Sequence, residues 1–337
     1  MVGLQAGAPN EVRRVLSGEW PVNVVNWAVK GNNRAGLWFG IGKGQIQMKL
    51  LRYGTPGEEK PGMLDASGHI RDLSGVVSDI GPDSISPAGL AKHRAVVVET
   101  LPVVNGSPRY GTPLRGIGKF IAVGLNYSDH AAETGMAIPA EPILFTKAIS
   151  CITGPNDPVV LPEGSTKGDW EAELGIVIGT TARYVAEDKA LDYVAGFCVI
   201  NDVSERQFQL ERGSQWDRGK GCDTFGPIGP WLVTTDEVGD PQNLDVWLDL
   251  NGQRMQTGST KTMIFGAAHL VSYISRFITL MPGDVITTGT PPGVGMGKKP
   301  QFFLKAGDVM TLGIQGLGSQ RQEVRGFTPG FWETYPN

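Results

Sequence analysis

Short apolar segments recur along this 337-residue chain, and each is bounded by glycine, proline or asparagine instead of a long helical pattern. The segments with the length and β-branched content of strands are FIAVGLN, ELGIVIG, VAGFCVIND, DVWLDLNGQ, DVITTGT and DVMTLGI. With 47 glycines and 23 prolines available for turns, the sequence predicts a β-rich α+β fold. Because the segments do not alternate with long helices, a doubly wound sheet and a barrel of βα units are excluded.

Two segments carry helical signals. Residues 262–278 have apolar side chains at helical spacing, which predicts one helix. In NYSDHAAETG, Ser128 is expected to cap a second helix and Gly135 to stop it. Gly124 and Gly135 bracket this second segment, as the hinges of a mobile lid would.

The pattern divides the chain into three parts. Residues 1–47 lack a hydrophobic period and the n-region and h-region of a signal peptide. We interpret them as an extension outside any domain, with the folded protein beginning at Met48; a transit peptide is the alternative, weakened by the scarcity of serine. Residues 48–116, with a strand and a hairpin about Ser67-Gly68, predict a small N-terminal domain. Residues 117–326 then form the main domain.

Charge and cysteine content narrow the classes of partner. The formal net charge is -4 and no long basic run is present, which argues against nucleic-acid binding. No stretch of 18 uncharged apolar residues predicts a membrane span. Cys151, Cys198 and Cys222 are widely spaced and fit neither a zinc site nor a disulfide framework. We expect free thiols in a cytoplasmic protein.

Two acids stand at the entrance of a predicted buried strand, in DWEAELGIVIG. Glu171 and Glu173 are two residues apart, so along a strand they point to the same face, roughly 6–7 Å apart. A solvated strand face is the alternative interpretation. Because two partly buried carboxylates repel each other, a divalent cation would relieve both the repulsion and the desolvation. Oxygen ligands favour hard cations such as Mg²⁺, Mn²⁺ or Ca²⁺.

A third acid, Asp202, ends the apolar strand VAGFCVIND and is placed to enter the same site. An Asx turn or a helix cap is its ordinary alternative role. His130 and Glu133 are three residues apart, so on a helix they share one face, where the histidine can act as a base oriented by the carboxylate. A surface helix pair is the alternative. The other three histidines have no comparable partner in the sequence.

Lysines and a glycine-rich loop complete the candidates. Lys147 follows the apolar PILFT, and Lys220 lies in the loop DRGKGCDTFGPIGPW, where a cation could pair with a substrate carboxylate. Both could equally be surface lysines. Residues 287–295, TTGTPPGVG, match neither the phosphate-loop pattern nor G-x-G-x-x-G opening a helix, so a dinucleotide site is rejected.

Seven motifs in one order resemble the fumarylacetoacetate hydrolase superfamily across residues 118–325. They are GLNYSDHAAETG, PILFTKAISCITGP, DWEAELGIVIG, VAGFCVINDVSERQFQ, GKGCDTFGPIGPW, MPGDVITTGTPPGVG and LKAGDVMTLGIQGLG. Residues 48–113 resemble the small N-terminal domain of its shorter bacterial members. The resemblance implies a mixed β-sandwich roll, usually a homodimer, with one Mg²⁺ or Mn²⁺ in each active site.

The resemblance also implies roles for individual residues. The metal ligands would be Glu171, Glu173 and Asp202, and the catalytic residues would be His130, Glu133 and Lys220. Residues expected in the substrate-binding site are Lys147, Phe145, Thr290, Gly289, Arg206 and Gln209.

The family chemistry begins with a small 2-oxo or 2-hydroxy acid, and from the resemblance we expect hydrolysis of a C–C bond in an acylpyruvate or a 2,4-diketo-3-deoxy sugar acid, with release of pyruvate, although the sequence does not separate this reaction from the others. The alternatives are ureidoglycolate lysis to glyoxylate and urea, or isomerisation, decarboxylation or dehydration of a 2-oxo acid. A non-catalytic binding protein on the same fold is disfavoured because the acids and the histidine–glutamate pair are intact. Shared fold leaves the substrate undetermined.

Overall fold

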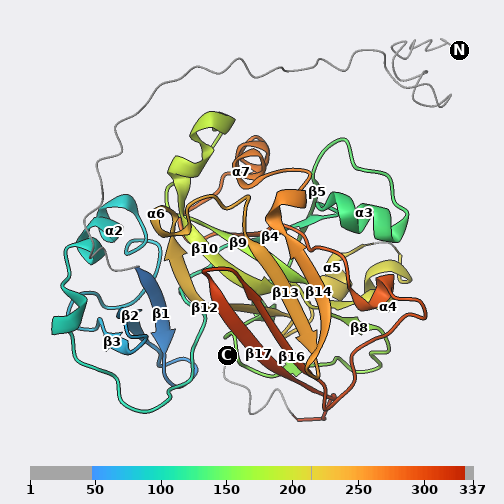
Figure 1. The fold of residues 1–337 in the computed structure, drawn as a ribbon, viewed down its shortest axis with the longest axis horizontal. Helices are drawn as coiled ribbons and strands as arrows, with labels where there is room; N and C mark the ends of the chain where they lie inside the picture. Colours follow the sequence, from blue (N-terminus) through green and yellow to red (C-terminus); the bar gives the residue numbers. More distant parts are fainter. Residues whose placement is uncertain (1–47, 214, 331–337) are drawn as a thin grey trace, which may run out of the picture. The chain divides into compact units, whose positions relative to one another are not determined.

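The computed structural model describes residues 48–213 and 215–330 (Figure 1). The predicted N-terminal extension, residues 1–47, lies outside the described residues. In the part of the chain that is described, no helix has both the length and the apolar content that a bilayer crossing requires.

The larger sheet has ten strands and mixes parallel with antiparallel pairs. Its spatial order is β3 (Ile70–Asp72), β2 (Lys60–Leu64), β1 (Lys49–Tyr53), β12 (Gly226–Thr234), β10 (Val194–Asn201), β9 (Ala172–Ile178), β15 (Val285–Thr287), β4 (Phe120–Gly124) and β5 (Ile143–Thr146), with β6 (Ile152–Thr153) paired to β12. Every residue of β9 and β10 is buried, which explains why residues 174–178 and 194–200 are continuously apolar instead of alternating.

A second sheet packs against the central strands of the first. Its order is β14 (Gln253–Ser259), β13 (Asp245–Leu250), β16 (Val309–Ile314), β17 (Gly318–Arg325) and β7 (Val159–Val160), while β8 (Gly168–Asp169) and β11 (Ser204–Glu205) form a separate pair. Strand β17 alternates buried and exposed residues, as a strand with one face toward a core should. Contacts of β13, β16 and β17 with β9, β10 and β12 make the two sheets a sandwich, which confirms the predicted β-rich α+β roll (Figure 1).

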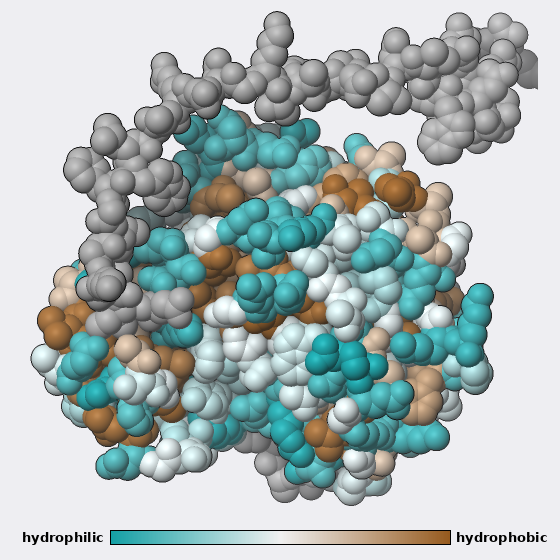
Figure 2. Space-filling model, viewed as in Figure 1, coloured by the Kyte–Doolittle hydropathy of each residue, from teal (hydrophilic) through white to brown (hydrophobic). Residues whose placement is uncertain are grey.

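The helices of the described residues are short, and the longest has nine residues. The α-helices are α2 (Pro87–Arg94), α3 (Ser128–Thr134), α4 (Arg206–Leu210), α5 (Asp217–Lys220), α6 (Thr235–Val238) and α7 (Ala267–Ser275). Single 3₁₀ segments are η1 (Val98–Thr100), η2 (Ile149–Cys151), η3 (Glu187–Tyr193), η4 (Thr260–Thr262) and η5 (Gly295–Gly297). On the face drawn in Figure 2, hydrophobic residues lie in separate small groups among hydrophilic ones.

The helix predicted over residues 262–278 is shorter in the structure, because a side chain from another segment holds its first part. Asn126 accepts a hydrogen bond from the Phe265 N–H at 2.8 Å and donates to the Phe265 carbonyl at 2.9 Å. These contacts fix Phe265 outside helical geometry, and α7 begins only after Gly266.

The predicted cap of α3 is wrong by one residue. Tyr127 is the N-cap and Ser128 is the first helical residue, because the Ser128 hydroxyl instead donates to the Thr262 carbonyl at 3.2 Å. Gly135 ends the helix as predicted, with a φ of 68° that a residue with a Cβ rarely adopts.

The N-terminal segment joins the main sheet. Strands β2 and β3 form the predicted hairpin, with Leu64 opposite Ile70, and β1 pairs with β12. A small apolar cluster of Leu51, Tyr53, Leu64 and Ile70 supports this part of the sheet. The domain boundary at residues 116–117 stays a prediction.

Candidate active site

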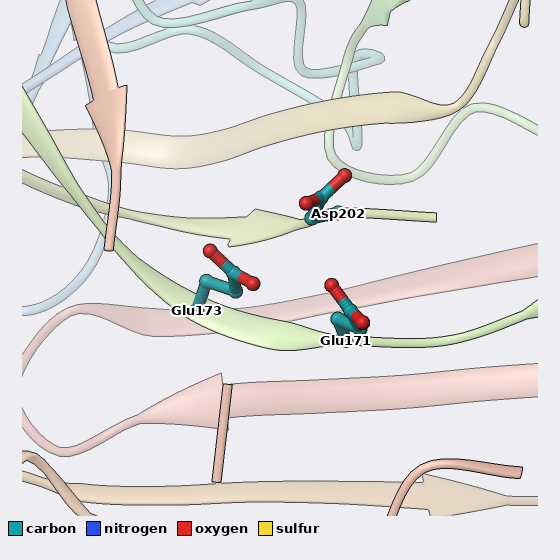
Figure 3. A group of neighbouring side chains, drawn as sticks. All are labelled: Glu171, Glu173 and Asp202. Atoms are coloured by element: carbon teal, nitrogen blue, oxygen red, sulfur yellow. The ribbon is translucent and has the colours of Figure 1, made fainter. Parts of the chain in front are cut away.

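The pairing of β9 with β10 brings three acids together. Ile200 lies opposite Glu173, and two residues further along each strand the Asp202 N–H donates to the Glu171 carbonyl at 2.9 Å. Residues opposite each other on antiparallel strands share a face, and so do residues two apart on one strand. Glu171, Glu173 and Asp202 therefore project from a single face toward one another (Figure 3).

The three carboxylates form a compact and buried group. Each offers an oxygen within 4.8 Å of the others, and the residues are 7%, 1% and 1% exposed. Burial, together with the charges of Asp202 and Glu171, raises the pKa of Glu173 well above its ordinary value. The arrangement therefore concentrates negative charge at one point.

Three cations compensate two of these acids. The Lys220 ammonium bridges Glu171 at 2.5 Å and Asp202 at 2.8 Å, Lys147 donates to Asp202 at 2.6 Å, and Arg206 donates to Glu171 at 2.6 Å. Burial alone would raise the pKa of Glu171, but Lys220 and Arg206 outweigh it and lower that pKa.

Glu173 differs from Glu171 and Asp202 in its hydrogen-bond partners. It accepts hydrogen bonds from the Thr287 hydroxyl at 2.5 Å and from the Gly289 N–H at 2.7 Å, and both donors are neutral. Among residues 48–213 and 215–330, no cationic side chain forms an ion pair with it. One negative charge of the triad is therefore without a counter-charge in contact.

A fourth buried acid, Asp169, was not predicted from the sequence. It accepts from Arg206 Nε at 2.8 Å and from the Gly295 and Met296 N–H groups at 2.7 and 3.0 Å. Its position, two residues before Glu171, repeats the spacing that identified the other two acids, so the signal was available. Asp169 thus ties Arg206 to the loop that carries η5.

Replacing Asp169 by asparagine should destabilise the protein strongly. Each carboxylate oxygen accepts two hydrogen bonds, so an amide nitrogen in either place would face two donors, and in both orientations Arg206 loses the charge of this partner. We expect the free energy of unfolding to fall by about 3–5 kcal/mol, the usual cost of breaking a buried ion pair. Asp249→Asn, which affects the exposed pair with Arg254, is the control and should cost under about 1 kcal/mol in the same urea titration. Equal losses would contradict the assignment.

The predicted histidine–glutamate pair is formed on α3. His130 Nδ1 lies 3.0 Å from Glu133 Oε2, and Glu133 also accepts the Gly293 N–H at 3.1 Å. The helix thus fixes the ring from one side, and the loop before η5 fixes the carboxylate.

The structure corrects one inference about the remaining histidines. His269, on α7, has a carboxylate partner that its sequence neighbourhood does not show, since Nδ1 lies 2.9 Å from Glu187 Oε2. This pair is not among the residues lining the site, whereas His130 is. A carboxylate partner alone therefore does not mark the candidate base.

One cavity gathers most of the predicted residues. It is lined by Val123, Gly124, Leu125, His130, Met136, Phe145, Glu171, Glu173, Arg206, Gln209, Leu210, Trp216, Lys220, Gly289, Thr290 and Met296. Asp202 and Glu133 are not lining residues, but each contacts one: Asp202 accepts from Lys220, and Glu133 lies beside His130. Lys147 is not a lining residue either. Its ammonium is enclosed and donates to Asp202, to the Val203 carbonyl and to the Lys220 carbonyl, which uses all three N–H groups. Its contacts position Asp202.

Residues 119–325 match the family model described as fumarylacetoacetate hydrolase C-terminal. A Burkholderia ambifaria protein with the name "Putative hydrolase" is 63% identical over 279 residues, which cover 82% of this chain and 99% of that protein.

Solved structures agree in fold. The fumarylacetoacetate hydrolase of Exiguobacterium antarcticum is 37% identical with a TM-score of 0.75 and covers 83% of this chain and all of that one. Maleylpyruvate hydrolase from Sphingobium sp. SYK-6, solved with manganese(II) and pyruvate, is 29% identical with a TM-score of 0.70 and the same coverage. The chain is an enzyme that belongs to the fumarylacetoacetate hydrolase superfamily, whose members are metal-dependent.

Proposed function

We propose that the protein hydrolyses a C–C bond in a small 2,4-dioxo acid, an acylpyruvate or a 2,4-diketo-3-deoxy sugar acid, and releases pyruvate. The observation that carries the proposal is that Glu171 and Glu173 of the buried triad line one cavity together with Lys220 and His130. The pyruvate bound to the Sphingobium relative supports the product class.

The residues present fit a divalent cation. Glu171, Glu173 and Asp202 offer only oxygen donors, which suit Mg²⁺ or Mn²⁺, and Glu173 has a charge that no cation contacts. The Lys220 ammonium between two of the acids shows that the group attracts positive charge. When bound there, the metal would act as a Lewis acid toward the 2-oxo acid end of the substrate.

The chain's own groups would carry the proton transfers. His130, held at Nδ1 by Glu133, takes a proton from water at its other nitrogen as the water oxygen bonds to C4 of the substrate. The C3–C4 bond then breaks, and its electron pair forms the enolate of pyruvate while C4 leaves as a carboxylic acid. Lys220 stabilises the enolate charge, and a proton at C3 completes pyruvate.

An assay of metal-dependent product release tests the proposal. The purified protein with Mg²⁺ or Mn²⁺ is offered acetylpyruvate, a diketo-deoxy sugar acid, ureidoglycolate and oxaloacetate. Pyruvate from the first two, lost with a chelator, is the expected result. Glyoxylate from ureidoglycolate alone would instead identify a lyase, and ultraviolet changes without cleavage would identify an isomerase.

The family resemblance also supports a cytoplasmic homodimer, which we include in the proposal. Light scattering of the purified protein should give twice the mass of one chain. A mass equal to one chain would refute the dimer and leave the proposed reaction untouched.

A further inference from the structure

The cavity has two chemically different halves. The polar half consists of Glu171, Glu173, Lys220, Arg206, Gln209, Gly289, Thr290 and His130; the other half consists of Val123, Leu125, Met136, Phe145, Leu210, Trp216 and Met296 beside Gly124. Among the described lining residues, no charged side chain belongs to the second half.

The cations of the polar half are committed to protein acids. Arg206 donates to Asp169, to Glu171 and to Gln209, and Lys220 bridges Glu171 and Asp202. These charges lie at the triad, where a substrate presents its 2-oxo acid end. They are therefore not available to a second carboxylate at the other end of the substrate.

Most neutral polar groups of this half already form hydrogen bonds within the protein. The Thr290 hydroxyl donates to the Ala172 carbonyl and accepts from Gln256, and the Gly289 N–H donates to Glu173. Neither can donate to a substrate oxygen in this arrangement.

Gln209 is the exception. Because arginine can only donate, the Gln209 atom 3.1 Å from Arg206 must be the oxygen, so its amide nitrogen points elsewhere. The residue is 4% exposed and lines the cavity, and its nitrogen forms no hydrogen bond with the described residues. Nor is this nitrogen one of the fully enclosed side-chain atoms that lack a hydrogen bond among those residues, so it is open to the cavity that Gln209 lines. One neutral donor is thus available to a carbonyl or hydroxyl oxygen.

The apolar half is built by close packing. The rings of Phe145 and Trp216 meet edge to face, with centroids 5.4 Å apart. Trp216 packs so closely on β4 that a Cβ at Gly124 would lie 2.5 Å from its ring, which accounts for this glycine without a hinge. Leu210 and Met136, 44% and 48% exposed, line the same cavity.

We infer that the acyl group of the substrate is uncharged and ends in hydrocarbon, with one oxygen accepting a hydrogen bond from Gln209. This inference rests on the proposed acylpyruvate hydrolysis and narrows it. A terminal carboxylate would be desolvated against Phe145 and Trp216, and the Lys220 ammonium, 5.2 Å from the Phe145 ring centroid, is already paired with Glu171 and Asp202. A polyhydroxylated end would offer several hydroxyls where Gln209 supplies one donor.

A matched substrate series measures this preference. Butanoylpyruvate and 3-carboxypropanoylpyruvate differ only in a terminal methyl or carboxylate, and kcat/KM should favour the first by about 100-fold or more. Propanoylpyruvate should be about fourfold poorer than butanoylpyruvate, the worth of one buried methylene. Equal kcat/KM values for the methyl and carboxylate forms would overturn the inference.

A binding measurement separates this inference from the reaction itself. N-propyloxamate and N-(2-carboxyethyl)oxamate carry the 2-oxo acid end but no cleavable C–C bond of an acylpyruvate. Calorimetry with Mg²⁺ present should show the propyl compound binding at least tenfold tighter. If that preference holds while no acylpyruvate is cleaved, the proposed reaction fails and the apolar substrate class stands. If the two bind equally, the inference fails whatever the reaction is.

A positive charge placed in the apolar half should weaken the preference for the methyl end. Leu210→Lys, at an exposed position at the end of α4, should narrow the methyl-to-carboxylate ratio at least tenfold, because it supplies the missing cation. Phe277→Lys, at an exposed position just after α7 that does not line the cavity, is the control and should leave the ratio unchanged. An unchanged ratio in Leu210→Lys would show that the acyl end lies elsewhere.

Discussion

Glu173→Gln is expected to stop turnover and, at the same time, to stabilise the metal-free protein. Loss of one of three acidic ligands should lower kcat by about 10³-fold or more, since Lewis-acid stabilisation is worth several kcal/mol. Yet Glu173 is the acid whose charge no cation contacts, so removing that charge relieves repulsion from Asp202 and Glu171. The glutamine oxygen can still accept from Thr287 and Gly289.

Thermal unfolding of chelator-treated protein measures the second effect. The melting temperature should rise by on the order of 2–4 °C for each kcal/mol of repulsion removed. A raised carboxyl pKa means that the folded state favours the protonated form, so this contribution to stability is present at low pH and is lost as pH rises above 4.5 through the raised pKa. Wild type should show that decline, and Glu173→Gln should not.

Glu171→Gln is the matched control. Its carboxylate is paired with Lys220 and Arg206, and the pKa of Glu171 is lowered, so its contribution is lost only as pH falls below 4.5. At neutral pH, removing this charge should destabilise the metal-free protein. If Glu173→Gln also destabilises it, the uncompensated charge assigned to Glu173 does not exist.

His130→Ala should lower kcat by about 10²–10⁴, the usual worth of a positioned general base. Affinity for Mg²⁺, measured by calorimetry, should stay near that of wild type, because His130 is not one of the three acids that would hold the metal and its ring is held by Glu133. Glu133→Gln should cause a similar or smaller loss, and the double variant should add little, since groups acting as a unit are not additive.

A second histidine–glutamate pair provides a control for the role of the His130–Glu133 pair. His269 Nδ1 on α7 lies 2.9 Å from Glu187 Oε2 on η3, nearly the distance in the His130–Glu133 pair, but neither residue lines the cavity, so His269→Ala should leave kcat unchanged. Near-normal kcat in His130→Ala would show that the base is another group.

The predictable parts of the site were those encoded by local spacing. The pair Glu171 and Glu173 follows from the two-residue period of a strand, and Asp202 from the end of an apolar strand. Asp169 obeys the same period and could have been found.

Other features depended on contacts between distant segments. The apolar wall could not be derived, because Leu210 and Trp216 reach the cavity from a five-residue helix and a loop with no period of their own. Contacts between distant segments also explain the two helix starts that were predicted wrongly. The Ser128 hydroxyl bonds to the Thr262 carbonyl instead of capping α3, and Asn126 bonds to the Phe265 backbone, so α7 starts later than its pattern predicts. The sequence also favoured Lys147 as a pocket residue, whereas tertiary contacts enclose its ammonium behind Asp202.

The triad forms only when β9 and β10 pair in their native register. Asp202 meets Glu171 only while Ile200 lies opposite Glu173, and a slip of one residue would turn the Asp202 side chain to the other face of the sheet. The two strands are separated by a long connection, so this pairing carries a loop-closure cost that local structure does not share. During refolding, high-affinity metal binding should therefore return with the late, non-local pairing and not with the first collapse of the chain.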